Sequence, residues 1–167
     1  MKLPMTEPLI RAYLTNAYQM SILGCYENTK PWIFSNFIQL QTQDNDVDTI
    51  TFYLPDDYGY GYSILTPFFD YKSINRDFIQ SNNLNFIDLI IKSNLTSEYI
   101  SFYVNEKHIP NSLANKHQLN FNHKIMIHGI EGSFAFYYGF DENQVYKEKK
   151  INLEQLEIAY FDNVYDY

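Results

Sequence analysis

The chain has 167 residues, of which 46% are hydrophobic and 19% charged, and its formal net charge is −8 at pH 7. This composition excludes a disordered chain and allows a buried core without disulfide or metal support. The acidic balance disfavours nucleic acids and anionic membrane surfaces as partners, because both are bound through clustered Lys and Arg. The single cysteine, Cys25, excludes an internal disulfide.

The sequence carries no segment that would cross a membrane. It has no run of about eighteen apolar residues, and residues 1–8 lack the apolar core and cleavage site of a signal peptide. We therefore expect a cytoplasmic protein with no membrane partner, folded as one domain over residues 1–167. The only basic run, Lys147-Glu148-Lys149-Lys150, is interpreted as a solvated turn.

The first half of the chain is mainly helical in pattern. Apolar spacing predicts an amphipathic helix over 9–23 that stops at Gly24. Pro31 can begin a second helix that buries apolar residues over 32–40, although a strand from Trp32 fits the same pattern. After a turn at 44–46, the sequence predicts a strand over 49–54, a loop over 56–62 and two short helices over 74–80 and 86–92.

In the second half the apolar pattern changes to alternation. It predicts four strands over 99–104, 123–130, 133–140 and 144–151, with a long loop over 105–120 and a tight turn at Glu131-Gly132. Asn152 and Gln155 have the spacing of a capping box, which predicts a last helix through Tyr160. Helices followed by a meander of antiparallel strands indicate an α+β fold, with the N-terminal helices packed on a C-terminal sheet.

Two side chains are candidates for chemistry. A lone thiol such as Cys25 can be a nucleophile, although a buried and inert cysteine is the more common case. His123 begins a predicted strand and shares its face with Ile125 and Ile127, so its ring can meet a thiol from a helix on that face. A structural histidine bonded to a carbonyl group is the alternative.

The other histidines fit no metal or cofactor site. His128 falls on the opposite face of the strand from His123, so the two cannot share a metal ion. His108 and His117 lie in the predicted loop, and we expect both to be solvated. The sequence has no phosphate-binding loop and no Rossmann pattern, and we expect neither a metal nor a cofactor.

Three segments together resemble a known group of proteins. These are the helix with Gln19 and Cys25 followed by Trp-Ile-Phe-Ser-Asn-Phe-Ile-Gln-Leu over 32–40, the strand Tyr-Ile-Ser-Phe-Tyr-Val-Asn-Glu over 99–106, and His-Lys-Ile-Met-Ile-His-Gly-Ile over 123–130. The last segment resembles the histidine strand of the bacteriocin-processing cysteine peptidases, which are papain-like. The layout also resembles the N-terminal domain of the butirosin biosynthesis protein H family, found in peptide and aminoglycoside antibiotic clusters.

The resemblance implies a papain-like fold and specific roles. Cys25 would be the nucleophile and His123 the general base, and the Gln19 amide would join the oxyanion hole. Asp141 would orient the imidazole, although Asn143 could also serve and Tyr138 lies close to where the acid is expected. Papain-like enzymes carry the cysteine at a helix N-terminus, whereas Cys25 follows the end of the predicted helix.

Three hypotheses about function follow. The first is a bacterial cysteine-dependent enzyme for acyl transfer or amide cleavage in nonribosomal or other peptide natural-product biosynthesis. The second is a non-catalytic binding module on a degenerate papain-like fold that holds a carrier protein or peptide. The third is an accessory or immunity protein. Carrier proteins are acidic, so this acidic chain would need a local basic patch to bind one.

Overall fold

The computed structural model describes residues 1–6, 18, 21–27, 29, 39–43, 46–53 and 74–165 of the chain. The chain divides into two compact units. The sheet unit comprises Met1–Leu3 and Lys72–Tyr167, and the hairpin unit comprises Pro4–Tyr71. The expectation of one domain over residues 1–167 stays a prediction.

The hairpin unit contains a helical segment and a β-hairpin. Residues 21–23 are helical and Gly24 begins the turn after them, as predicted. Strand β1 (Gln39–Gln43) pairs antiparallel with β2 (Asp46–Tyr53), which confirms the predicted strand over 49–54. The helix expected over 32–40 is wrong at its end, because Leu40 lies in β1 and pairs with Phe52. Residues 31–38 lie outside the described part of the chain.

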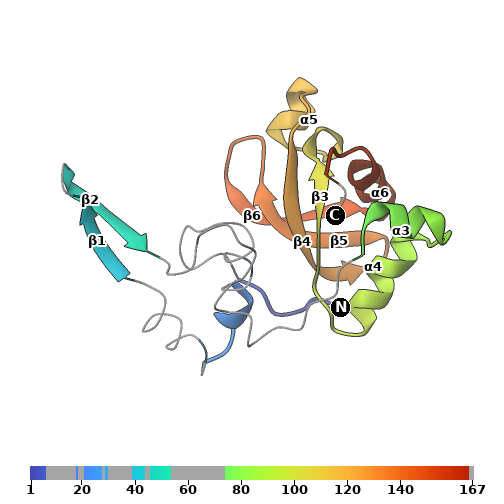
Figure 1. Cartoon of the computed structure of the whole chain (residues 1–167), viewed down its shortest axis with the longest axis horizontal. Helices are drawn as coiled ribbons and strands as arrows, with labels where there is room; N and C mark the ends of the chain where they lie inside the picture. Colours follow the sequence, from blue (N-terminus) through green and yellow to red (C-terminus); the bar gives the residue numbers. More distant parts are fainter. Residues whose placement is uncertain are drawn as a thin grey trace. The chain divides into compact units, whose positions relative to one another are not determined.

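The sheet unit is built on a four-strand antiparallel meander, so the predicted α+β class with a meander sheet is confirmed (Figure 1). The strands follow one another in the sheet in chain order: β3 (Ile100–Asn105), β4 (Asn122–Glu131), β5 (Phe134–Phe140) and β6 (Tyr146–Asn152). Gly132 makes the tight turn between β4 and β5 with a φ of 60°, a conformation that glycine adopts without steric cost.

The helices of this unit begin at polar caps. They are α3 (Arg76–Ser81), α4 (Phe86–Leu95), the 3₁₀ helix η2 (Glu106–His108), α5 (Leu113–His117) and α6 (Leu153–Phe161). An Asn side chain caps α3, α4, η2 and α6, and a Ser side chain caps α5, each accepting a hydrogen bond from a first-turn backbone N–H. The long loop expected over 105–120 is therefore wrong, since it contains η2 and α5.

Helices α4 and α6 lie on the same side of the sheet and bury its core face (Figure 1). Phe86 of α4 stacks on Tyr160 of α6, with ring centroids 4.4 Å apart, and Phe102 of β3 meets both rings edge-on. The sheet contributes alternate residues to this core, including Val104, Ile125, Ile127, Ala135 and Ile151. Burying each large side chain contributes about 1.5–3 kcal/mol to folding.

Residues Met1–Leu3 extend the sheet along β4. Lys2 bridges Gly129 in an antiparallel arrangement, on the part of β4 beyond its pairing with β3. The Met1 backbone nitrogen donates to the Ile130 carbonyl, Ile130 N donates to Met1 O at 3.1 Å, and Leu3 N donates to the carbonyl of His128. The bare Cα of Gly129 allows this approach, because a Cβ there would lie 3.0 Å from the Lys2 Cα.

One basic segment has a different structure from the solvated turn that was predicted for it. Lys147-Glu148-Lys149-Lys150 belongs to β6 and is not a solvated turn. Lys149 is only 9% exposed because it alternates onto the core face, while its neighbours point away.

No helix among the described residues is long and apolar enough to span a bilayer.

Candidate functional site

Cys25 lies at the C-terminal end of a helical turn in the hairpin unit. Its backbone N donates to Ile22 O at 3.1 Å, and its Sγ donates to Ser21 O at 3.4 Å. Burial raises the pKa of the thiol above its ordinary value, and a hydrogen bond with Thr6 only partly opposes this. The carbonyl end of a helix also disfavours a negative charge. The local environment therefore favours the protonated thiol over the thiolate.

The other predicted contacts of the thiol stay predictions. Gln19 lies outside the described residues, so its role in an oxyanion hole has no structural description. Cys25 belongs to the hairpin unit and His123 to the sheet unit. The convergence of sulfur and imidazole also stays a prediction.

His123 faces a carboxylate at one end of the sheet. It pairs with Val104 across β3 and β4, and its Nε2 atom lies 3.5 Å from Oε2 of Glu106. This separation satisfies an ion pair but not a hydrogen bond, and Nε2 has no hydrogen-bond partner among the described residues. The ring stacks on Phe121 with centroids 5.1 Å apart. As expected, His128 is on the opposite face, where Nε2 lies 2.9 Å from Glu148.

Asp141 is engaged in the turn between β5 and β6. Its Oδ1 accepts hydrogen bonds from the backbone N of Asn143 at 2.9 Å and of Val145 at 3.0 Å, and its Oδ2 pairs with Lys147 at 3.2 Å. The hydrogen bond from Val145 is the main cause that lowers the pKa of Asp141. All its described partners lie in this turn or at the start of β6, and none of them is His123.

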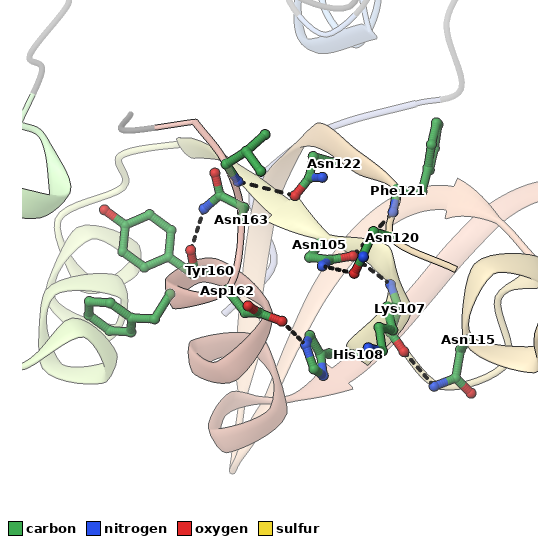
Figure 2. Close-up of polar contacts among 12 residues, drawn as sticks. Asn105, Lys107, His108, Asn115, Asn120, Phe121, Asn122, Tyr160, Asp162 and Asn163 are labelled. Atoms are coloured by element: carbon green, nitrogen blue, oxygen red, sulfur yellow. Dashed lines mark hydrogen bonds and ion pairs between the residues drawn. The ribbon is translucent and has the colours of Figure 1, made fainter. Parts of the chain in front are cut away.

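Glu106, which the sequence analysis did not single out, is the carboxylate beside His123. It follows Val104 by two positions, so continuing the strand alternation through the predicted loop would have placed it on the His123 face. Glu106 N donates to Phe121 O at 2.7 Å, and the buried Asn105 side chain accepts from Phe121 N at 3.2 Å. Figure 2 shows Asn105 and its contacts with Asn120 and Phe121. This network fixes the backbone around Glu106.

Two further polar side chains lie on the core face near this end. Tyr137 is 2% exposed, and its hydroxyl group has no hydrogen-bond partner among the described residues. Lys149 pairs with Tyr137 across β5 and β6 and donates from Nζ to the Phe140 carbonyl at 3.0 Å. Burial lowers the pKa of Lys149, and the charges of Glu106 and Asp141 partly oppose this. Sequence reading missed both side chains as site candidates.

A polar hollow of about 220 Å³ lies beside η2. It is lined by Lys107, His108, Asn115, Gln118, Gln155 and Ile158, which include two basic side chains and three amides but no carboxylate. Asn115 donates to Lys107 O at 2.8 Å, and His108 donates from Nε2 to Asp162 at 2.5 Å (Figure 2). His108 is partly exposed and also pairs with Asp162, and His117 is exposed, as expected.

Four of the six residues that line the hollow lie in the most basic stretch of this acidic chain. Residues 107–130 hold all four histidines and three lysines, and they contain no Asp or Glu. The absence of acids over these residues was visible in the sequence, but the basic residues are too scattered to form a run. Four of them, Lys107, His108, Lys116 and His117, lie in η2 or α5, and the other three lie in β4.

Among the described residues, no three His, Cys, Asp or Glu side chains are grouped as they would be to hold a metal ion. The chain matches no known family model, and no curated protein or solved structure is significantly similar to it.

Proposed function

We propose that this chain is a non-catalytic binding protein on a papain-like fold, and that its polar hollow holds an acidic segment of a carrier protein or peptide. The hollow is the observation that carries the proposal. Lys107 and His108 supply positive charge or hydrogen-bond donors, and the side-chain amides of Asn115, Gln118 and Gln155 add further donors. Such a lining complements a carboxylate or phosphate group.

Charge distribution supports an acidic partner in spite of the net charge of −8. The hollow has no carboxylate in its lining; Asp162, which binds Nε2 of His108, is not among the residues that line it. Lys116 and His117 of α5 are exposed and directly follow Asn115 of the hollow, so they add to the basic surface. A local basic patch steers an acidic partner even when the whole chain is acidic.

The environment of Cys25 supports a non-catalytic function. A nucleophilic thiol in a papain-like site is activated by a lowered pKa. Burial raises the pKa of Cys25, and its Sγ already donates to the carbonyl of Ser21. Binding through the sheet unit requires nothing of this thiol.

The proposal is tested by fluorescence anisotropy with a labelled peptide of alternating Glu and Ser, compared with Gln/Ser and Lys/Ser peptides of the same length. We expect the acidic peptide alone to bind, more weakly as salt is raised. Replacing Lys107 by Gln should weaken binding about two- to fivefold, and Lys107→Glu should weaken it more.

Lys92→Glu is the matched control, because Lys92 is exposed on α4 and does not line the hollow. Lys92→Glu changes the net charge by the same amount as Lys107→Glu. Because Lys92 lies outside the lining of the hollow, this variant should bind the acidic peptide about as tightly as the wild type. Cys25→Ser should also leave the affinity unchanged. Equal losses in the Lys107 and Lys92 variants would reduce the effect to net charge and contradict a defined site.

A second candidate function is the cysteine-dependent acyl transfer or amide cleavage that the sequence predicts. The pair of His123 and Glu106 favours it, because a carboxylate beside the imidazole stabilises the imidazolium formed when a base takes a proton. In this mechanism His123 removes the thiol proton of Cys25, and Glu106 takes the orienting role expected of Asp141. Iodoacetamide labelling of Cys25 that is faster than that of a free thiol, and slowed by His123→Ala, would support this candidate.

A further inference from the structure

We propose that Glu106, His123 and Tyr137 enclose a binding site for one hydroxyl group, which donates to the Glu106 carboxylate and accepts from the Tyr137 hydroxyl. The site is separate from the polar hollow and does not depend on the proposed function. Its occupant is either a water molecule or the hydroxyl group of a small ligand.

Strand register brings His123 and Tyr137 to the same face of the sheet, and Glu106 follows directly after β3. His123 pairs with Val104 of the core. Glu106 is the first residue of η2, and its Oε2 atom lies 3.5 Å from Nε2 of His123. Tyr137 pairs with Ile127, which lies on the His123 side of β4.

The Tyr137 ring leans toward the end of the sheet where His123 lies. A Cβ built on Gly139 would lie 3.0 Å from the Tyr137 Cε2 atom and 3.7 Å from Cδ of Lys149. Both side chains therefore extend over Gly139, toward the end of β5 beside which β4 begins. Gly139 provides the space for this, because it has no side chain. The charge of Glu106 adds to burial in raising the pKa of Tyr137, as expected of a nearby carboxylate.

Two of the three groups lack a hydrogen bond that their burial calls for. The Tyr137 hydroxyl and the His123 Nε2 are buried without a partner among the described residues. The Glu106 side chain is 14% exposed, and its only described ion pair is the 3.5 Å contact with His123. Buried polar groups are normally paired, either directly or through an ordered water molecule. One hydroxyl group between them satisfies a donor and an acceptor at once.

The neighbouring charges favour a neutral occupant. Lys149 already places an ammonium group near Glu106, so a second cation would be repelled. A hydroxyl group carries no charge and both donates and accepts. The Asn105 side chain accepts hydrogen bonds from the backbone N of Lys107 and of Phe121 (Figure 2). Glu106 N also donates to Phe121 O, so the backbone around Glu106 is held in place.

The test compares thermal unfolding of Tyr137→Phe with the wild type. If the Tyr137 hydroxyl is hydrogen-bonded to an occupant, its removal should lower Tm by about 3–6 °C. If the hydroxyl is buried without a partner, its removal should raise Tm or leave it unchanged, and the proposal is overturned. Tyr165→Phe is the matched control, because Tyr165 is 42% exposed. It should leave Tm unchanged.

Glu106→Gln tests whether the same occupant joins the two side chains. The decrease in Tm of the double variant Tyr137→Phe/Glu106→Gln should be smaller than the sum of the decreases in the two single variants. If the two side chains act independently, the decreases should be additive. A crystal structure then identifies the source: a single ordered water, or a longer density matched by added mass in native mass spectrometry. Additive losses with no density between these side chains would overturn the proposal.

Discussion

Gly129→Ala should release residues Met1–Leu3 from the edge of β4. An alanine Cβ at this position would lie 2.8 Å from Cγ of Lys2, 3.0 Å from its Cα and 3.2 Å from the Met1 carbonyl oxygen. The Lys2 side chain can move aside, but two of these three atoms belong to the backbone. The short strand must therefore shift away from β4 or detach.

The magnitude follows from what the short strand contributes. Its contacts include three backbone hydrogen bonds with β4 and one from the Asn94 side chain to the Met1 carbonyl, and Leu3 is 7% exposed. Four such hydrogen bonds contribute about 2–6 kcal/mol together, and burying one leucine about 2 kcal/mol. Ordering three residues costs about 3–6 kcal/mol. The net loss expected for Gly129→Ala is about 1–3 kcal/mol.

Chemical denaturation measures the loss of stability, and hydrogen exchange locates it. The amides of Leu3 and Ile130 should lose protection selectively, because their hydrogen bonds join the short strand to β4. Gly132→Ala is the control: nothing lies within 4 Å of its Cβ position, so only its positive φ opposes alanine. Normal protection of both amides in Gly129→Ala would refute the reasoning.

Three further predictions concern the thiol, a buried phenol and a buried amide. Iodoacetamide should label Cys25 more slowly at pH 7 than a free cysteine peptide, because burial raises its pKa; equal or faster labelling would contradict this. Burial also holds the pKa of Tyr137 above its ordinary value of 10.0. The unfolded state then releases this proton first, so stability should fall above pH 10 by up to about 1.4 kcal/mol per pH unit, and Tyr137→Phe should flatten that fall in pH-dependent denaturation. Asn105→Ala should cost about 2–3 kcal/mol in the same assay, whereas a similar loss in the exposed Asn120→Ala would argue against a special role for Asn105.

The sheet was predictable because its strands alternate clearly. The residues of β3 to β5 place apolar side chains at every second position, and Asn152 marks the start of α6 through its capping side chain. Helix α5 could not be predicted, because five residues are too few to show a helical period. Its formation depends on the Ser112 cap and on packing against η2.

The face of His123 was predictable from alternation, but its partner was not. Glu106 lies just after a strand, where the sequence suggested an irregular loop, and only the pairing of β3 with β4 shows that it meets His123. Lys149 was missed because lysine is rarely buried. Its burial follows from its place opposite Tyr137 on the core face.

The central claim is that an acidic segment binds at the polar hollow, without help from the thiol. The most direct test adds the Glu/Ser peptide to the ¹⁵N-labelled protein and follows the backbone amide signals of the protein by NMR. We predict shifts confined to η2, α5 and the part of α6 that carries Gln155 and Ile158. Shifts centred on the signals around Cys25, with those of the hollow unmoved, would contradict it.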